Sequence, residues 1–320
     1  MRVIQVTEHG GPEVLALNEA PTPHPGTGHI VVDVAAAGLN YIDTYQRSGS
    51  YPIDTPFVLG MEGAGTVREV GGGVHSISVG DRVAWKEGLG SYAESVAIEA
   101  AQAVPVPEGV TDELAAAVIL QGITAHYLAT STYPVQEGEW VVVHAAAGGV
   151  GQLLTQIVKL RGGHVLATTS TTEKAALASA AGADQVVTYG EMLDAATELT
   201  GGIGVAAVYD GVGASTFDDG LAALRIRGTM ALFGAASGPV PPLDPQRLNR
   251  AGGLYLTRPS IAHYTRDRAE LISRTDEIFG WISDGSLAVQ VGRRYPLAEA
   301  GQAHRDLEGR KTTAKVLLIP

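Results

Sequence analysis

The chain has 320 residues, of which 45% are hydrophobic and 18% charged, a balance typical of a globular protein with room for two domains. Its net charge of −12 argues against nucleic acid or a membrane as the main partner, because an acidic surface repels phosphate groups. Cysteine is absent, which excludes disulfides, thiolate catalysis and every cysteine-ligated metal site.

The N-terminal part of the chain has the pattern of a β domain. Turn-rich stretches such as Pro21–Gly28 and Gly71–Gly73 separate short apolar or alternating runs. We therefore expect a twisted, barrel-like arrangement of strands. A helix is expected at Asp112–Leu128, with Thr111 as its N-cap. The predicted strands are Val3–Val6, Ile30–Ala36, Ala64–Val70, Arg82–Ala84 and Tyr92–Ile98.

The sequence gives little support for a membrane segment. Leu114–Gln136 is uncharged and long enough to span a bilayer, but it contains Gln121, His126 and Pro134. The first residues resemble a strand and not a basic and apolar leader. These features predict a soluble cytoplasmic protein without nucleic-acid or membrane partners.

The stretch Glu139–Lys159 combines a strand, a glycine turn and a helix. Trp140–His144 is apolar and β-branched, Ala145–Gly151 consists of small residues, and apolar side chains then recur at helical spacing. This order opens a dinucleotide-binding βαβ unit, in which the helix N-terminus offers N–H groups to a pyrophosphate. The first glycine of the usual G-x-G-x-x-G pattern is Ala146 here.

Strands and helices alternate after Trp140, which predicts a doubly wound parallel sheet and an α/β fold class. The final strand has no βαβ partner nearby, so we expect it to return to the first domain. The expected strands are Val141–His144, Val165–Thr168, Gln185–Val187, Val205–Tyr209, Thr229–Phe233, Leu254–Thr257, Ser286–Tyr295 and Ala314–Leu318. The expected helices are Val150–Leu160, Glu173–Ala181, Met192–Leu199, Ser215–Leu224 and Ala269–Ser283.

Several motifs occur in order along the whole chain. They are Ala37–Asp43, Gly60–Gly65, Gly90–Glu94, Gln121–Thr124, Ala145–Gly151 with Gln156 and Lys159, Tyr209–Gly213, Phe233–Gly234, Thr257–Ser260 and Lys315–Leu318. With this set the chain resembles the zinc-independent medium-chain dehydrogenases/reductases, specifically the NADPH:quinone oxidoreductases related to zeta-crystallin. The resemblance implies a GroES-like β-barrel catalytic domain of residues 1–122 and 262–320. It also implies a Rossmann NADPH-binding domain of residues 123–261, with the active site in the cleft between the two domains.

The same resemblance indicates that no metal is bound. Zinc alcohol dehydrogenases of the superfamily hold their catalytic zinc with a cysteine, a histidine and a second cysteine, where this chain has Asn40, Met61 and Leu120. This set cannot form a tetrahedral zinc site. Without a Lewis acid, alcohol and ketone interconversion is disfavoured, whereas a quinone accepts hydride readily. A conjugated enal or enone is the nearest competing substrate.

The cofactor is expected to be NADPH and not NADH. An NAD-specific fold carries an acid about 20 residues after the glycines, and Val165–Thr172 contains none. Ser170 and Lys174 follow the second strand, where they could hydrogen-bond to a 2′-phosphate and neutralise it, although Lys174 by itself also fits a solvated first-turn residue. In similar quinone reductases a tyrosine and a C-terminal arginine join them, at positions matched by Tyr189 and Arg310.

The resemblance assigns the remaining site residues. It places Asn40, Tyr41, Asp43 and Tyr45 beside the nicotinamide and the acceptor as candidate catalytic residues, although Asp43 fits equally well as a helix N-cap. Tyr51 is a candidate quinone contact or, alternatively, a loop aromatic that covers the barrel. The other candidate cofactor residues are Tyr41, Tyr45, Thr124, Ala147, Gly148, Gly149, Val150, Phe233, Gly234, Ser237, Thr257 and Arg258.

These expectations combine into a homodimeric NADPH-dependent quinone reductase, paired through Leu254–Thr257, that transfers a hydride or single electrons. The first alternative is an NADPH-dependent reductase of α,β-unsaturated aldehydes and ketones. The second is a non-catalytic NADPH-binding structural protein. Turnover with any acceptor would exclude the second alternative.

Overall fold

Strands from both ends of the chain build the first of two units. The computed structural model describes residues 1–320, and the first unit consists of Met1–Leu120 and Asp267–Pro320. The second unit is the continuous segment Gln121–Arg266. The division falls within helix α2, Asp112–Tyr127, whose N-cap is Thr111 as predicted: its hydroxyl accepts a hydrogen bond from the amide of Leu114 at 3.2 Å.

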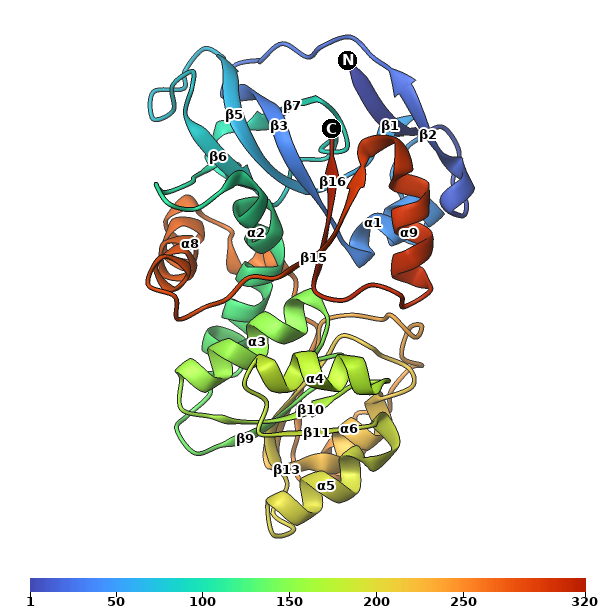
Figure 1. Cartoon of the computed structure of the whole chain (residues 1–320). Coiled ribbons are helices and arrows are strands. Elements are labelled where there is room, and N and C mark those ends of the chain that lie inside the picture. The colour runs from blue at the N-terminus through green and yellow to red at the C-terminus, as the bar shows by residue number, and fades with distance from the viewer. The chain divides into compact units, whose positions relative to one another are not determined.

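The first unit contains a three-stranded and a seven-stranded sheet. The small sheet has the order β2-β1-β4, and the large one runs β15-β16-β3-β5-β6-β8, with β7 paired to β3. The predicted return of the C-terminal strand is confirmed, because Val316 of β16 pairs with Leu39 of β3 in antiparallel register; these strands lie side by side in Figure 1 (red and blue). The strands are β1 Arg2–Val6, β2 Leu15–Glu19, β3 His29–Leu39, β4 Phe57–Val58, β5 Glu62–Val70, β6 Arg82–Trp85, β7 Ser95–Glu99, β8 Val104–Pro105, β15 Val291–Pro296 and β16 Lys315–Ile319.

Helices and an aromatic core complete the first unit. Its core packs Trp85, Tyr92 and Tyr295 among aliphatic side chains of β1, β3, β5 and β16. Helix α1, Tyr41–Ser48, ends at Gly49 in the left-handed conformation, and α8 and α9 lie in the C-terminal segment. The bounds of the latter are Arg268–Ser283 for α8 and Ala300–Glu308 for α9.

The second unit is the predicted parallel sheet. Its six strands have the order β11-β10-β9-β12-β13-β14, and every pairing is parallel. The strands are β9 Trp140–Val143, β10 His164–Thr168, β11 Gln185–Val187, β12 Val205–Asp210, β13 Leu224–Leu232 and β14 Tyr255–Thr257. The helices are α3 Gly149–Leu160, α4 Thr172–Ala180, α5 Met192–Leu199, α6 Phe217–Ala223 and α7 Gln246–Arg250. The buried β-branched run of β9 explains its central place, since both faces of an inner parallel strand are covered.

The boundaries differ from the prediction at a few elements. Three strands and two helices were not predicted, namely β2, β4, β8, α7 and α9, and α1 was considered only as a short helix with Asp43 as its N-cap. The strand expected at Ser286–Tyr295 starts only at Val291, and the one expected at Tyr92–Ile98 starts at Ser95. One helical stretch, Asp112–Thr132, is long and apolar enough to cross a membrane, but most of it is buried within the protein, as in the core helices of soluble proteins.

Candidate functional site

The turn between β9 and α3 is shaped by glycines. Gly148 is the N-cap of α3, and the helix begins at Gly149. A Cβ on Gly149 would collide with Oε1 of Gln121, while a Cβ on Gly151 would lie 2.5 Å from the carbonyl oxygen of Ala145. The turn therefore leaves no room for side chains at Gly149 and Gly151, and its backbone N–H groups lie at a helix N-terminus. This cradle fits the pyrophosphate of a dinucleotide.

The candidate cofactor residues of the second unit gather along one edge of the sheet. The strands are all parallel, so their carboxyl ends meet at this edge, where dinucleotides bind in such sheets. The glycine turn follows β9, the central strand next to the point where strand order reverses. Further residues at these strand ends are Ser170 after β10, Tyr189 after β11, Phe233 and Gly234 after β13, and Thr257 and Arg258 at the end of β14.

The residues expected at the 2′-phosphate divide between the two units. Ser170 and Lys174 flank the start of α4, whose N-cap Thr171 accepts a hydrogen bond from the Lys174 amide at 3.3 Å. The Tyr189 ring stacks against His144, with ring centroids 5.8 Å apart. Arg310 follows α9 in the first unit, with a positive φ of 57°. The fold of the second unit thus brings three of the four expected residues to one edge.

His144 is a residue that the sequence reasoning missed. It ends the strand expected at Val141–His144, and its Nδ1 lies 2.8 Å from the Thr168 hydroxyl. Burial lowers the pKa of His144, against the opposing effect of the Asp210 charge, so the ring that supports Tyr189 is held neutral.

Thr124 and Ser237 lie in different surroundings. Thr124 is buried on α2, whereas Ser237 belongs to the loop after β13. The Ser237 hydroxyl donates to the Val212 carbonyl at 2.8 Å and accepts from the Ser215 amide at 3.1 Å. Ser237 therefore fastens the loops after β12 and β13 to each other, in addition to the cofactor role expected of it.

A buried polar group surrounds the start of α1 in the first unit. The N-cap of α1 is Asn40, and Asp43 is the third helical residue, which differs from the expectation that Asp43 itself is the N-cap. The Asp43 carboxylate accepts hydrogen bonds from the backbone amide of Asn40 at 2.8 Å and from the Tyr92 hydroxyl at 2.9 Å. Both bonds reach Oδ2, and Oδ1 of Asp43 is buried without a partner. Asp43 thus stabilises the first turn of α1 by binding the backbone amide of its N-cap residue.

The Asp43→Asn variant should become more stable relative to the wild type as the pH rises. Burial raises the pKa of Asp43 to about 7, above the ordinary value of about 3.9 for this side chain. The native state then binds more protons than the unfolded state between pH 4 and 7, so stability falls as pH rises through this window. The amide of asparagine still accepts from Asn40 and has no charge to bury.

The measurement is urea unfolding of both proteins at pH 5 and pH 8. We expect the free-energy difference between D43N and the wild type to shift in favour of D43N by on the order of 2 kcal/mol from pH 5 to pH 8. A difference that does not change with pH would show that the carboxylate is already ionised without cost in the folded protein.

The three candidate tyrosines form one aromatic row. The ring centroids of Tyr41 and Tyr45 are 6.4 Å apart, and those of Tyr45 and Tyr51 are 5.2 Å apart. The Tyr41 hydroxyl donates to the carbonyl of Leu307 at 3.2 Å, whereas Tyr51 is 45% exposed. This row is a surface on which a planar aromatic molecule can stack.

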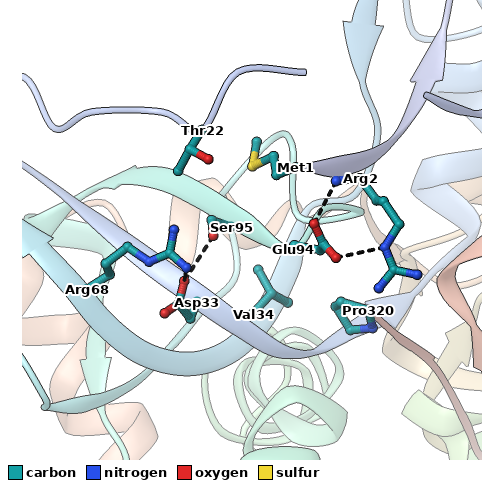
Figure 2. A pocket seen from close by; sticks show the side chains of 9 residues that line it. All are labelled: Met1, Arg2, Thr22, Asp33, Val34, Arg68, Glu94, Ser95 and Pro320. Atoms are coloured by element: carbon teal, nitrogen blue, oxygen red, sulfur yellow. Dashed lines mark hydrogen bonds and ion pairs between the residues drawn. The ribbon is translucent and has the colours of Figure 1, made fainter. Parts of the chain in front are cut away.

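A pocket of about 470 Å³ lies elsewhere on the first unit, and Figure 2 shows its lining. Its charged side chains already pair with one another: Arg2 binds Glu94 at 2.7 Å, and Arg68 binds Asp33 at 2.8 Å. None of the candidate site residues lines this pocket. It is therefore not the candidate site.

Comparisons with known proteins agree with this arrangement. Residues 26–108 match the alcohol dehydrogenase GroES-like domain, and residues 149–274 match the zinc-binding dehydrogenase family. The quinone oxidoreductase of Escherichia coli, solved in complex with NADPH, is 42% identical with a TM-score of 0.98, and the match covers 100% of both chains. The chain belongs to the quinone oxidoreductase family.

Two further relatives bear on cofactor and substrate. A mycobacterial protein solved in complex with NADPH is 53% identical, with a TM-score of 0.98 over 100% of both chains. A 2-haloacrylate reductase from a Burkholderia species is 35% identical over 325 residues, 98% of each chain. The predicted family and fold class are thus confirmed, and NADPH, the predicted cofactor, is the one bound in both solved relatives.

One matched family is described as zinc-binding, yet the corresponding positions in this quinone oxidoreductase family member do not fit zinc. The Asn40 amide is engaged by Glu62 and by the Lys315 ammonium, whose Nζ lies 3.0 Å from Asn40 Oδ1. Met61 Sδ accepts a hydrogen bond from the Gln46 side chain at 3.2 Å. No group of three histidine, cysteine or carboxylate side chains in residues 1–320 is placed to hold a metal ion. The position next to Asn40 is occupied by the buried ammonium group of Lys315.

Sequence reasoning assigned no role to Glu62 or Lys315, although both belong to the motifs typical of the family. A signal was present, because Lys315 opens an otherwise apolar strand and Glu62 stands in a run of small residues. Lysine and glutamate are almost never fully buried unless they are paired. The sequence pattern could therefore indicate that Glu62 and Lys315 are unusual charged residues, but it could not show that they pair with each other.

Proposed function

We propose that this protein is an NADPH-dependent quinone reductase that works without a metal. When bound, NADPH supplies a hydride from its nicotinamide C4 to the quinone. The observation that carries the proposal is the glycine turn at the N-terminus of α3, on the carboxyl edge of a parallel sheet whose order is that of dinucleotide-binding folds. The location of the quinone between the two domains remains a prediction.

Each candidate residue has a proposed task except Asp43, whose carboxylate is engaged by the Asn40 backbone amide and the Tyr92 hydroxyl. Residues 147–150 and Thr124, with Phe233, Gly234, Ser237, Thr257 and Arg258, hold the pyrophosphate, ribose and nicotinamide parts of NADPH. Ser170, Lys174, Tyr189 and Arg310 hold the 2′-phosphate. Tyr41, Tyr45 and Tyr51 present rings to a planar acceptor, and Asn40 orients the reacting groups. Residues 1–122 and 262–320 are the proposed catalytic domain, and residues 123–261 the proposed NADPH-binding domain.

The second candidate function is reduction of a conjugated double bond. It is favoured by the 35% identity to a 2-haloacrylate reductase, and a solved 2-haloacrylate reductase shares the fold over the whole chain with a TM-score of 0.88. Both reactions need the same cofactor site and an acceptor whose hydride adduct is stabilised by conjugation. The shape of the acceptor pocket decides between them.

The deciding experiment follows NADPH oxidation with ortho- and para-quinones and with 2-alkenals, all in the presence of a metal chelator. Turnover confined to quinones supports the proposal, and turnover confined to alkenals moves the function to double-bond reduction. If NADPH binds but no acceptor is reduced, the protein is a non-catalytic NADPH-binding protein. A semiquinone signal during turnover would show that electrons are transferred singly and not as a hydride.

We further propose a cytoplasmic homodimer that pairs through β14. This strand is the edge of its sheet, and Tyr255, Leu256 and the nearby Ile226 are exposed hydrophobic side chains, Ile226 by 74%. A second copy would cover this edge.

Light scattering after gel filtration should give twice the 33.1 kDa chain mass for the wild type. We expect the chain mass for Ile226→Asp, because a buried unpaired charge opposes pairing. Ile203→Asp is the matched control, since Ile203 is 73% exposed in a loop of the same unit and should leave the dimer intact. A monomeric wild type would contradict the proposal.

A further inference from the structure

A buried ion pair lies directly behind Asn40, a candidate catalytic residue. Lys315 is the first residue of β16, and Glu62 is the first residue of β5; their side chains are 2% and 0% exposed. The Lys315 ammonium forms an ion pair with Oε1 of Glu62. Two charges taken out of water are costly unless their remaining hydrogen-bonding groups also find partners.

The ion pair is completely hydrogen-bonded. The three protons of the ammonium face three acceptors, namely Oε1 of Glu62, Oδ1 of Asn40 at 3.0 Å and the carbonyl of Leu39 at 3.3 Å. Oε1 of Glu62 also accepts from Nδ2 of Asn40 at 2.5 Å, and Oε2 accepts from the Leu120 amide at 2.9 Å. The amide group of Asn40 thus bridges the two charges.

This arrangement permits only one orientation of the Asn40 amide. Lysine can only donate hydrogen bonds, and an ionised glutamate can only accept them. A rotation of the amide by half a turn would place Oδ1 against the Glu62 carboxylate and Nδ2 against the Lys315 ammonium. Both contacts would be repulsive, and little water can enter because Asn40 is only 6% exposed.

We propose that Glu62 and Lys315 are positioning residues for the candidate catalytic Asn40, which they lock in one rotamer and one amide orientation. The inference rests on the proposed reductase function for its catalytic consequence, but the locking itself does not. A charged pair fixes the orientation of the Asn40 side-chain amide, and a neutral pair would not. A glutamine in place of Glu62 would offer a donor as well as an acceptor, so it could bind the amide in either orientation.

The test removes both charges together in Glu62→Gln/Lys315→Met. A single substitution would leave one buried charge unpaired and could unfold the protein, whereas loss of both charges is commonly tolerated. The matched control is Glu113→Gln/Arg294→Met, because this pair lies in the same unit, is 2.5 Å apart and is 40% and 51% exposed. Circular dichroism and the NADPH dissociation constant verify that both variants are folded.

The first measurement concerns the lock alone. In the wild type and in the control variant, hydrogen exchange of the Asn40 side-chain amide, assigned by its loss in Asn40→Ala, should be slow by NMR. In Glu62→Gln/Lys315→Met it should exchange at least roughly tenfold faster, because the charge-assisted bonds are gone. Equal exchange in both proteins, or rapid exchange in the wild type, would overturn the proposal whatever the enzyme does.

The second measurement concerns catalysis, with kcat taken at saturating NADPH and KM for NADPH taken from a series of NADPH concentrations. We expect kcat with a quinone to fall roughly tenfold in Glu62→Gln/Lys315→Met, since small misplacements of reacting groups are costly, while KM for NADPH stays unchanged. Addition of Asn40→Ala should cause no further loss beyond that of Asn40→Ala alone, because the pair acts through Asn40. If the losses of kcat from Asn40→Ala and from Glu62→Gln/Lys315→Met multiplied in the triple variant, or if kcat were unchanged in the double variant, the positioning role would be refuted. A wild type without turnover would refute the proposed function. In that case the exchange measurement would still decide whether the pair locks Asn40.

Discussion

Replacing Gly151 by alanine should weaken NADPH binding at least roughly tenfold and lower the stability of the second unit by about 3 kcal/mol, the upper end of overpacking costs. The added Cβ would lie 2.5 Å from the Ala145 carbonyl oxygen and 2.6 Å from the Ala146 Cα. Both are backbone atoms, which cannot rotate away as a side-chain end can. The start of α3 must therefore move away from the glycine turn, and the N–H cradle moves with it.

The control for this substitution is Gly280→Ala in α8. No atom lies within 4 Å of a Cβ at Gly280, so alanine should be neutral or slightly stabilising in that helix. Thermal unfolding and titration of NADPH fluorescence measure the two effects. If G151A bound NADPH like the wild type, the close packing of α3 would not be what shapes the cofactor site.

Replacing Lys174 by alanine should raise the dissociation constant for NADPH roughly 10- to 100-fold and leave that for NADH nearly unchanged. A hydrogen bond to a charged group contributes about 1.5–3 kcal/mol, and only NADPH has the 2′-phosphate that Lys174 is proposed to bind. Lys174 lies in the first turn of α4, directly after β10, and its backbone is fixed by the Thr171 cap. The ratio of the two dissociation constants is the quantity to measure.

Lys159→Gln is the matched control, because it removes the same charge from the same unit. Lys159 lies in the last turn of α3, at the opposite end from the glycine turn, and its ammonium binds Asp184 at 2.8 Å. We expect its NADPH to NADH ratio to equal that of the wild type. Equal losses of NADPH and NADH binding in K174A would show that Lys174 supports the fold of α4 and does not select the cofactor.

The second unit was predictable because its signals are local. The apolar run of β9, the glycine turn and the helical spacing of α3 follow one another directly, and the observed bounds of α5, Met192–Leu199, equal the predicted ones. Elements without such a signal were missed. Strand β2 is mostly exposed or half-buried and so shows no apolar alternation, and β4 has only two residues.

The support of Asn40 could not be predicted in the same way. Its partners Glu62 and Lys315 lie 22 and 275 positions away in the sequence, and only the pairing of β16 with β3 brings the last strand to the first helix. A pattern can show that a buried lysine is unusual, but its partner depends on tertiary structure.

The position of β16 also dictates when the first unit can be completed during synthesis. Gln121–Arg266 is continuous and can fold as soon as it leaves the ribosome, whereas the Ala37–Leu39 end of β3 must wait for residues 316–318. Until then an apolar strand edge stays open, and such edges pair readily with other chains. Glu62 likewise has no counter-charge until Lys315 has been synthesised, so the second unit can fold while the seven-stranded sheet of the first unit is still incomplete.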